Sequence, residues 1–460
     1  MSSLYARHAL LPQGWASNVR LHWNEHGDLI QIEHDASLQA HGHEYEQQAQ
    51  WVLPGMSNLH SHAFQRAMAG MTEMAGLAGE GKDSFWTWRD LMYRYALHIT
   101  PEQILAIAAQ LYAECLRHGY TAVCEFHYLH RNQEGSFYAR PAEMAERVIA
   151  AAEQTGMGIS MLPVLYSYAD FGEQALRHDQ RRFSTNVEEI LQLIAALEGK
   201  RNAQVEVGVA PHSLRAASIS QIRELVAALP VERPIHIHIA EQQKEVDACI
   251  AYSGKRPVEL LLDSDLLNQR WCLVHATHLN KAEVQGIAAS GAVAGICTTT
   301  EGNLGDGFFD LPDYIAAGGR FGIGSDSHVS QSPVEELRWL EYGQRLRLQG
   351  RNIAGTPAQR KVGDFLYQAA LQGGAQASGR KLGQLKVGYR ADIVVLDDAH
   401  PNLAGIDSTD VLNTWIFAGN DNLVRDVYVG GQQVVQDGKH LRQAEIRAAY
   451  AECMRSLRAL

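Results

Sequence analysis

Short apolar runs alternate with amphipathic stretches through the middle of the chain. Most of the runs precede a stretch in which apolar residues recur every three or four positions, as in ISQIRELVAAL and KAEVQGIAASG. The runs occupy positions 56–59, 121–126, 159–165, 205–210, 235–240, 272–276, 292–297 and 321–325. Continuous apolar runs indicate buried strands, and the helical spacing indicates amphipathic helices. Strands that alternate with helices in this way predict an α/β fold of the (β/α)8 TIM-barrel type.

Both ends of the chain carry a different pattern, which is typical of β-hairpins. VRLHW and LIQIE flank the turn sequence NEHGD near the start, and VRDVYVGGQQVVQDG near the end turns at Gly430 and Gly431. ADIVVLD indicates one more buried strand. We therefore expect residues 1–53 and 385–460 to form one small composite β-sandwich domain beside a barrel domain of residues 54–384.

Composition and charge narrow the range of functions. The chain has 460 residues, of which 46% are hydrophobic and 20% charged, a balance typical of globular proteins. The net charge of −12 argues against a nucleic-acid or anionic-membrane surface. No apolar run approaches the roughly 18 residues of a membrane span, and the start MSSLYARHALLPQGWASNVR lacks the layout of a signal peptide. The six cysteines are scattered without C-x-x-C spacing, so we expect free thiols and a soluble protein of the cytoplasm.

Histidine is the unusual residue, because several of the 21 histidines cluster where the predicted strands end. His60 and His62 are two residues apart, so both point to one face of the first strand. An isolated pair of this kind is more often incidental than metal-binding. PIHIHIAEQ changes this estimate, because it adds His238 and Glu241 at the end of the fifth strand. We expect His236 of the same stretch to fill a deeper layer of the barrel.

Two further strand ends contribute candidate residues. VHATH offers His275 at the end of the sixth strand, either as a metal ligand or as a partner of the attacking water. FGIGSDSH offers Asp326 at the end of the eighth strand as a carboxylate ligand and base. The carboxylate of Glu241 is placed to take a proton from a metal-activated water and pass it to a leaving group. Because such barrels carry their chemistry at the carboxyl ends of strands, these clusters together predict a metal-dependent hydrolytic site.

The stretches PGMSNLHSH, HIHIAE, VHATH and GSDSH, with VGYRADIVVLD near the end, resemble the amidohydrolase superfamily over nearly the whole chain. The resemblance implies one divalent metal ion held by His60, His62, His238 and Asp326. It also implies that Glu241 is the proton shuttle of the deaminase branch and that His275 orients the water. Members with two metal ions carry a lysine on the fourth strand, and VEVGVAPHSLR has none. We therefore expect a single ion, Zn²⁺ in the first place and Fe²⁺ as the alternative.

Within that branch, several stretches resemble the formimidoylglutamate deiminases of histidine degradation. The residues that carry this resemblance are Gln65, Arg89, Tyr128, His212 and Arg215. It implies hydrolysis of the small anionic substrate N-formimino-L-glutamate to N-formyl-L-glutamate and ammonia, by an enzyme that we expect to be a homodimer. The residues agree with this substrate, because two arginines can each hold one of its two carboxylates in a bidentate pair.

Two other functions stay open at this point. One is an amidohydrolase that deaminates a cyclic amidine such as guanine or an adenosine derivative, for which Arg89 and Arg215 would face away from an aromatic pocket. The remote one is a non-catalytic barrel that serves as a scaffold. We also expect residues 63–100, which include the glycine-rich GLAGEGKDS, to act as a lid that brings Arg89 to the site. No role is assigned to His328.

Overall fold

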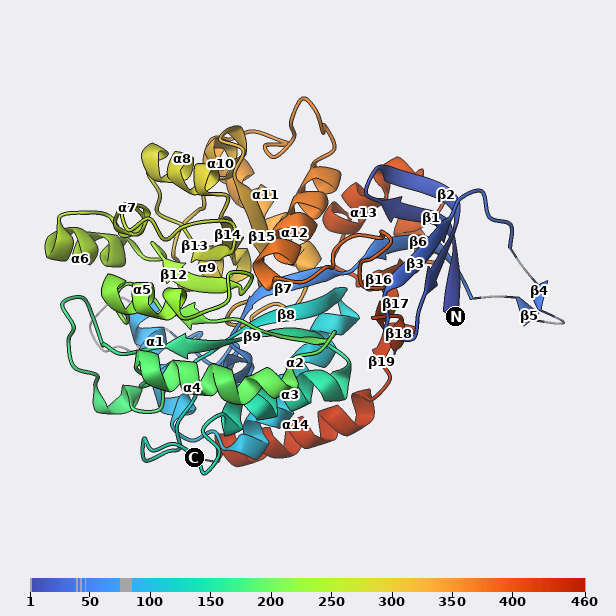
Figure 1. Ribbon diagram of the computed structural model, residues 1–460. Helices are drawn as coiled ribbons and strands as arrows, with labels where there is room; N and C mark the ends of the chain where they lie inside the picture. Colours follow the sequence, from blue (N-terminus) through green and yellow to red (C-terminus); the bar gives the residue numbers. More distant parts are fainter. Residues whose placement is uncertain (1, 39, 42–43, 46, 75–84, 460) are drawn as a thin grey trace.

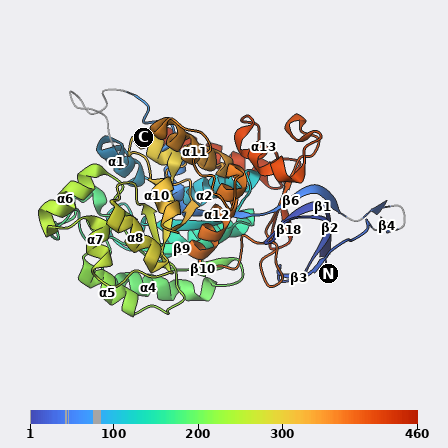
Figure 2. The same cartoon turned by 90° about the horizontal axis from the view of Figure 1, so that it is seen from above.

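The protein is described by a computed structural model, which covers residues 2–38, 40–41, 44–45, 47–74 and 85–459. Helices surround a set of strands that run through the middle of the larger part of the molecule (Figure 1). A smaller sheet at one side carries the N-terminus. The view from above shows the same division between the helix-covered part and the sheet (Figure 2).

The strands of the larger part form a parallel barrel. In chain order they are β7 (Met56–Ser61), β8 (Tyr120–His127), β9 (Gly158–Leu165), β10 (Val205–Val207) with β11 (Ala210–Pro211), β12 (Ile235–Ile239), β13 (Trp271–His275), β14 (Val293–Ile296) and β15 (Arg320–Ile323). Two single parallel bridges, Val209 with Ile235 and Ser61 with Asp326, join the two sheets that these strands form. The second bridge links the first strand to the last and so closes the barrel.

Helices follow most of these strands and pack on the outside of the barrel. They are α1 (Phe85–Ala96), α2 (Pro101–Arg117), α3 (Glu143–Thr155), α4 (Val187–Leu197), α5 (Ile219–Ala227), α6 (Gln243–Ser253), α7 (Pro257–Leu262), α8 (Lys281–Ser290), α9 (Thr298–Leu304), α10 (Leu311–Ala316), α11 (Pro333–Leu348) and α12 (Val362–Ser378). Several begin at capping boxes, for example at Thr100, Asn186, Ser218 and Asn280, whose side chains accept from backbone N–H groups of the first turn. Short 3-10 turns are η1 (Ala63–Met68), η2 (His178–Gln180), η3 (Glu198–Lys200), η4 (Pro401–Leu403) and η5 (Ser408–Asp410).

Strands from both ends of the chain form one eight-stranded sheet. Its order is β19 (Lys439–His440), β18 (Gln432–Gln436), β17 (Val424–Val429), β16 (Ile393–Leu396), β6 (Gln48–Pro54), β1 (Ser2–Leu11), β2 (Gly14–Trp23) and β3 (Leu29–Glu33). The sheet curls over a core of its own, so that Trp23 of β2 approaches Tyr428 of β17 with ring centroids 6.2 Å apart. The pair β4 (Ala40–His41) and β5 (Glu44–Tyr45) lies beside it, and α13 (Val411–Phe417) and α14 (Gln443–Arg458) complete the chain.

The predicted fold class is confirmed, since all eight predicted strand positions coincide with barrel strands and both predicted hairpins pair as antiparallel strands. The domain boundaries at 53/54 and 384/385 stay predictions. Helix α14 lies against α2 of the barrel, where the Cys453 thiol contacts the Gln103 carbonyl. Among the described helices, none is both long and apolar enough to cross a bilayer.

A glycine contact lets α12 pack against the strand pair that closes the barrel. A Cβ atom added at Gly373 would lie 1.9 Å from the carbonyl oxygen of Phe321, and one at Gly374 would lie 3.2 Å from Ser57. The helix therefore approaches the backbone of β15 at a distance that no larger residue allows.

We predict that Gly373→Ala lowers the free energy of unfolding by about 1–3 kcal/mol, because the added methyl must displace backbone atoms. Thermal and denaturant unfolding measure the change. Gly302→Ala is the control: this glycine lies on the exposed side of α9, and its added Cβ meets no atom within 4 Å. The control should gain up to about 1 kcal/mol from helix propensity. Equal stability of Gly373→Ala and the unmodified protein would contradict this account of the packing.

Candidate active site

Three histidines bring their Nε2 atoms together at the carboxyl ends of two strands. His60 lies near the end of β7, His62 directly follows this strand, and His238 lies near the end of β12. The Nε2 atoms of His60 and His62 are 3.1 Å apart, and the His238 Nε2 lies 3.0 Å from that of His60 and 3.3 Å from that of His62. All three side chains are buried.

Asp326 adds a carboxylate to this group from the loop after β15. Its Oδ1 lies 3.4 Å from Nε2 of both His60 and His62. The residue has a φ of 45°, which a side chain with Cβ rarely adopts, and its backbone N–H donates to the His60 carbonyl at 3.0 Å. The closure of the barrel therefore holds the Asp326 carboxylate against His60 and His62.

The donor atoms are spaced as ligands of one divalent ion are. Ligand atoms about 2.0–2.1 Å from such an ion lie about 2.8–3.4 Å apart when the angles at the ion are about 90–110°. The separations of the nitrogen and oxygen atoms, 3.0–3.4 Å, fall within this range. Within the described part of the chain, His60, His62 and His238 form a group of side chains able to hold a metal ion, and His60, His275 and Asp326 form another.

Two of these imidazoles are oriented from behind by backbone carbonyls. The His62 Nδ1–H donates to the Phe126 carbonyl at 2.8 Å, and the His238 Nδ1–H donates to the His212 carbonyl at 3.0 Å. Each hydrogen bond fixes the tautomer that leaves the Nε2 lone pair free for a cation. Burial lowers the pKa of His60 to about 3, so that the ring stays neutral, as a metal ligand must be.

His275 and Glu241 lie beside this group and face each other. His275 Nε2 is 3.6 Å from Glu241 Oε1 and 3.8 Å from Asp326 Oδ2. On the other side of the ring, Nδ1 lies 3.3 Å from Oε1 of the buried Glu301. Burial would lower the pKa of His275, but the three surrounding carboxylates outweigh it and raise that pKa to about 10. Burial also raises the pKa of Glu241 to about 7. A carboxyl group with such a pKa exchanges protons readily near neutral pH.

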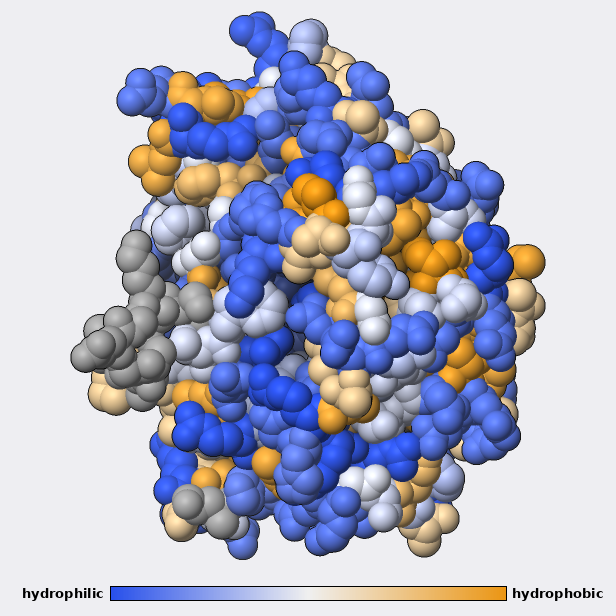
Figure 3. Space-filling view, turned by 90° about the vertical axis from the view of Figure 1, so that its left-hand side faces the viewer, coloured by the Kyte–Doolittle hydropathy of each residue, from blue (hydrophilic) through white to orange (hydrophobic). Residues whose placement is uncertain are grey.

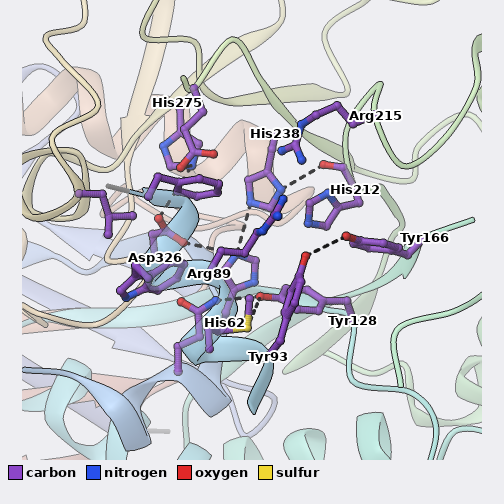
Figure 4. A pocket seen from close by; sticks show the side chains of 16 residues that line it. His62, Arg89, Tyr93, Tyr128, Tyr166, His212, Arg215, His238, His275 and Asp326 are labelled. Atoms are coloured by element: carbon purple, nitrogen blue, oxygen red, sulfur yellow. Dashed lines mark hydrogen bonds and ion pairs between the residues drawn. The ribbon is translucent and has the colours of Figure 1, made fainter. Parts of the chain in front are cut away.

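A cavity opens in front of these residues. Its wall combines polar groups of the site with aromatic and apolar side chains. The lining residues are His62, Gln65, Phe85, Trp88, Arg89, Met92, Tyr93, Tyr128, Tyr166, His212, Arg215, His238, Glu241, His275, Leu304 and Asp326. Figure 4 shows Asp326 and His275 on one side of the cavity and Tyr93, Tyr128 and Tyr166 on another, with His212 beside Tyr166. The face of the molecule in Figure 3 carries many hydrophilic residues, with smaller hydrophobic patches between them.

Two arginines bring positive charge into the cavity. Arg215 follows β11 and is 7% exposed, and Arg89 reaches the cavity from α1. Their guanidinium groups approach the same part of the cavity in Figure 4. Among the described residues, no carboxylate lies within 4 Å of the Arg215 guanidinium, and that of Arg89 has only Asp90, at 3.9 Å. The cavity therefore holds two cations that lack strong partners, an arrangement suited to an anionic ligand.

Hydrogen-bonded side chains form the remaining polar wall. Gln65 Nε2 donates to the Tyr128 hydroxyl at 2.8 Å, and the Gln65 Oε1 is buried without a partner in the described part of the chain. The hydroxyls of Tyr93 and Tyr166 lie 3.2 Å apart, and Gln180 donates to both of them, at 3.3 and 2.9 Å. A ligand in the cavity can therefore donate a hydrogen bond to Gln65.

The structure brings together all the site residues predicted from the sequence. Ten of them line the cavity, and His60 lies directly behind His62 and His238. Other histidines of the sequence clusters lie elsewhere: His236 contacts the Ala377 carbonyl, His278 the Asp306 carbonyl, and His328 lies between the hydroxyls of Ser61 and Ser325. The metal-binding, catalytic and substrate-binding roles of the predicted residues stay predictions.

Sequence reasoning missed several residues of the site. Glu301 and Tyr166 come from segments without a recognisable motif, although Glu301 follows the seventh predicted strand. Tyr93 lies in FWTWRDLMYR, a stretch from which only Arg89 was predicted. Of the predicted lid, Arg89 on α1 reaches the cavity, whereas the whole glycine-rich stretch GLAGEGKDS, residues 76–84, lies outside the described residues.

Comparison with known families gives two matches. The model of the amidohydrolase family matches residues 51–434. The model described as "Formimidoylglutamate deiminase HutF, N-terminal domain" matches residues 1–46. The two matches together span the barrel and most of the eight-stranded sheet.

Individual relatives extend over the same length. The chain is 53% identical over 458 residues to a formimidoylglutamate deiminase of Pseudomonas aeruginosa. This alignment covers 99% of this chain and 100% of the relative. A crystal structure of an amidohydrolase from Brucella melitensis matches with a TM-score of 0.92 and 44% identity over 99% of this chain and 100% of that one. An adenosine deaminase from Xanthomonas campestris with bound zinc matches with a TM-score of 0.79 and 18% identity over 100% and 98% of the two chains, which shows a common fold.

We predict that His238→Asn lowers the affinity for a divalent metal ion more than about 100-fold, because it removes one of four converging ligands. Metal analysis of the purified protein and the rise of Tm with added Zn²⁺ measure the loss, since an ion that binds only the folded state raises Tm. His278→Asn, in a neighbouring histidine cluster outside the donor group, is the control and should bind metal normally. Full metal occupancy of His238→Asn would remove this residue from the ligand set.

Proposed function

Because the chain belongs to the amidohydrolase family, we propose that it catalyses the hydrolytic deimination of N-formimino-L-glutamate to N-formyl-L-glutamate and ammonia, a step of histidine degradation. The full-length similarity to a formimidoylglutamate deiminase supports this proposal. The single structural observation that carries it is the pair of arginines, Arg89 and Arg215, in the same cavity as the histidine–aspartate group. A substrate with two carboxylates and a hydrolysable amidine matches both halves of this cavity.

Four residues would hold the metal ion in this proposal: His60, His62, His238 and Asp326. Three imidazoles and one carboxylate favour Zn²⁺, with Fe²⁺ as the alternative. When bound, the ion would lower the pKa of a water molecule and act as a Lewis acid toward the formimino group.

The residues beside the donor group would direct the protons. Glu241 accepts a proton from the attacking water, whose oxygen forms a bond to the formimino carbon, and then delivers that proton to the imino nitrogen, which becomes an amine. The hydroxyl proton of the resulting tetrahedral intermediate passes by the same carboxylate to this nitrogen as the carbon–nitrogen bond breaks, so that ammonia leaves and the carbonyl group of N-formyl-L-glutamate forms. His275 Nε2 and the Asp326 carboxylate hold the water during the attack, while the His275 Nδ1–H donates to Glu301 and keeps the ring in this orientation.

The other cavity residues would bind the glutamate part of the substrate. Arg215 and Arg89 each pair with a carboxylate, and the Gln65 Oε1, which has no partner in the described part of the chain, accepts a hydrogen bond from a substrate N–H group. Tyr128 holds Gln65, and His212 fixes His238 through its backbone carbonyl and packs its ring 4.8 Å from that of His238. The aromatic rings of the wall exclude water from the reacting group.

The rival function, deamination of a cyclic amidine, requires that the two arginines face away from the pocket. The cavity is partly aromatic, as that function requires, but both arginines line it. Their position favours a dianionic substrate over a nucleoside. The homodimer and the cytoplasmic location expected from the sequence stay predictions, and light scattering of the purified protein measures the oligomeric state.

Product analysis tests the proposed reaction. Incubation of the metal-loaded protein with N-formimino-L-glutamate should release one ammonia per substrate and give the formyl proton signal of N-formyl-L-glutamate in the NMR spectrum. Formamide with free glutamate, or ammonia only from guanine and adenosine compounds, would overturn the proposal.

We predict that Glu241→Gln lowers kcat by about 10²–10⁴-fold while the protein keeps its metal ion, because the amide cannot accept the proton of the water. Steady-state kinetics and metal analysis measure the two effects. The control is Glu224→Gln on the exposed side of α5, which should leave kcat unchanged. A wild-type kcat in Glu241→Gln would exclude the proposed proton transfer.

We predict that Arg215→Met raises KM for N-formimino-L-glutamate by about 10- to 100-fold, because a charge-assisted hydrogen bond to a carboxylate is lost. The kinetic constants of the variant are compared with those of Arg351→Met, which removes an exposed arginine remote from the cavity. If kcat/KM of Arg215→Met stays normal, this arginine does not bind the substrate.

A further inference from the structure

Trp86, near the start of α1, is the common neighbour of three positive charges. The Arg89 guanidinium carbon lies 4.5 Å from the centroid of its ring, the Lys244 ammonium nitrogen also 4.5 Å, and the Arg215 guanidinium carbon 5.6 Å. The three cations come from three different elements: α1, α6 and the loop after β11. One indole ring therefore joins α1 to two parts of the barrel rim.

The cations around Trp86 have few anionic partners of their own. Within the described chain, no ion pair joins Lys244 or Arg215 to a carboxylate, and Arg89 has only the distant contact with Asp90. The Nε–H groups of Arg89 and Arg215 are buried without a hydrogen-bond acceptor in the same part of the chain. Water does not replace the missing acceptors, because both arginine side chains are largely buried.

Arg89 and Arg215 are like charges in a poorly solvated region and repel each other strongly, so another group must compensate for their approach. A carboxylate among them would do so, but it would also neutralise the charge that an anionic substrate needs. The face of an indole ring attracts cations through its quadrupole and carries no net charge. Trp86 therefore stabilises the cluster and leaves its positive charge available to a ligand.

We propose that Trp86 is a positioning residue that gives the site its preference for a doubly negative substrate, by holding Arg89, Arg215 and Lys244 around one ring without neutralising them. The exposed Lys244 is the third cation of this arrangement and adds to the preference from the rim. This inference rests on the proposed function, because it concerns how the same cavity distinguishes N-formimino-L-glutamate from less charged amidines.

Two pairs of compounds test the charge preference. N-formimino-L-glutamine has nearly the size of N-formimino-L-glutamate but carries one negative charge fewer. N-formyl-L-glutamine differs from N-formyl-L-glutamate in the same way. Steady-state kinetics with the first pair and titration calorimetry with the second give the preference of each variant as a ratio of kcat/KM values or of Kd values.

Trp86→Leu should lower the preference for the doubly negative compound about tenfold, through KM and Kd, with kcat within about threefold of wild type. Trp86→Phe keeps an aromatic face and should retain most of the preference. Lys244→Met should lower it about threefold, whereas Lys281→Met, which removes an exposed lysine outside the cavity, should leave it unchanged. Circular dichroism and metal content of each variant check the fold.

An unchanged preference in Trp86→Leu, with both compounds bound equally more weakly, would overturn the inference and reduce Trp86 to a packing role. Calorimetry separates this result from a failure of the proposed function, because binding of the N-formyl compounds needs no turnover. If the wild-type protein hydrolyses neither formimino compound but Trp86→Leu still loses the binding preference, the proposed reaction is wrong and the role of Trp86 stands.

Discussion

The closure of the barrel between β7 and β15 is the constraint on which the site depends. The backbone N–H of Asp326 donates to the carbonyl of His60, and the N–H of His62 lies 3.4 Å from the carbonyl of Asp326. The hydrogen bonds that join the first strand to the last therefore also set the distance between the Asp326 carboxylate and the two histidines. Because α12 covers this closure through glycine contacts, an error in packing there would separate side chains that are far apart in the sequence.

The two halves of the cavity differ in the charge of their side chains. In one half, the carboxylates of Glu241, Glu301 and Asp326 surround neutral or protonated imidazoles, an arrangement that suits a cation and proton transfer. In the other half, Arg89 and Arg215 have no strong anionic partner among the residues that the structure describes. The net charge of the protein is −12, which does not favour anion binding. An anionic ligand must therefore be attracted by the local positive charge of the two arginines.

The sequence was sufficient to predict those parts of the structure that follow from local residue patterns. Strand periodicity located the barrel, and the strand ends located His60, His62, His238, Glu241 and Asp326, because side chains at i and i+2 share a face and parallel strands end at one edge. Contacts that depend on packing between distant segments were not predictable: Glu301 behind His275, the Tyr93–Tyr166 pair and Trp86 against three cations carry no local pattern. The roles of Arg89 and Arg215 were predicted from resemblance. The structure shows in addition that neither arginine has a strong carboxylate partner among the described residues.

A crystal structure of the metal-loaded Glu241→Gln variant with N-formimino-L-glutamate tests the central claim most directly. The account predicts one ion bound by His60, His62, His238 and Asp326, with the formimino carbon next to it and a substrate carboxylate paired with each of Arg89 and Arg215. An ion held by other residues, or a substrate whose carboxylates contact neither arginine, would contradict the account.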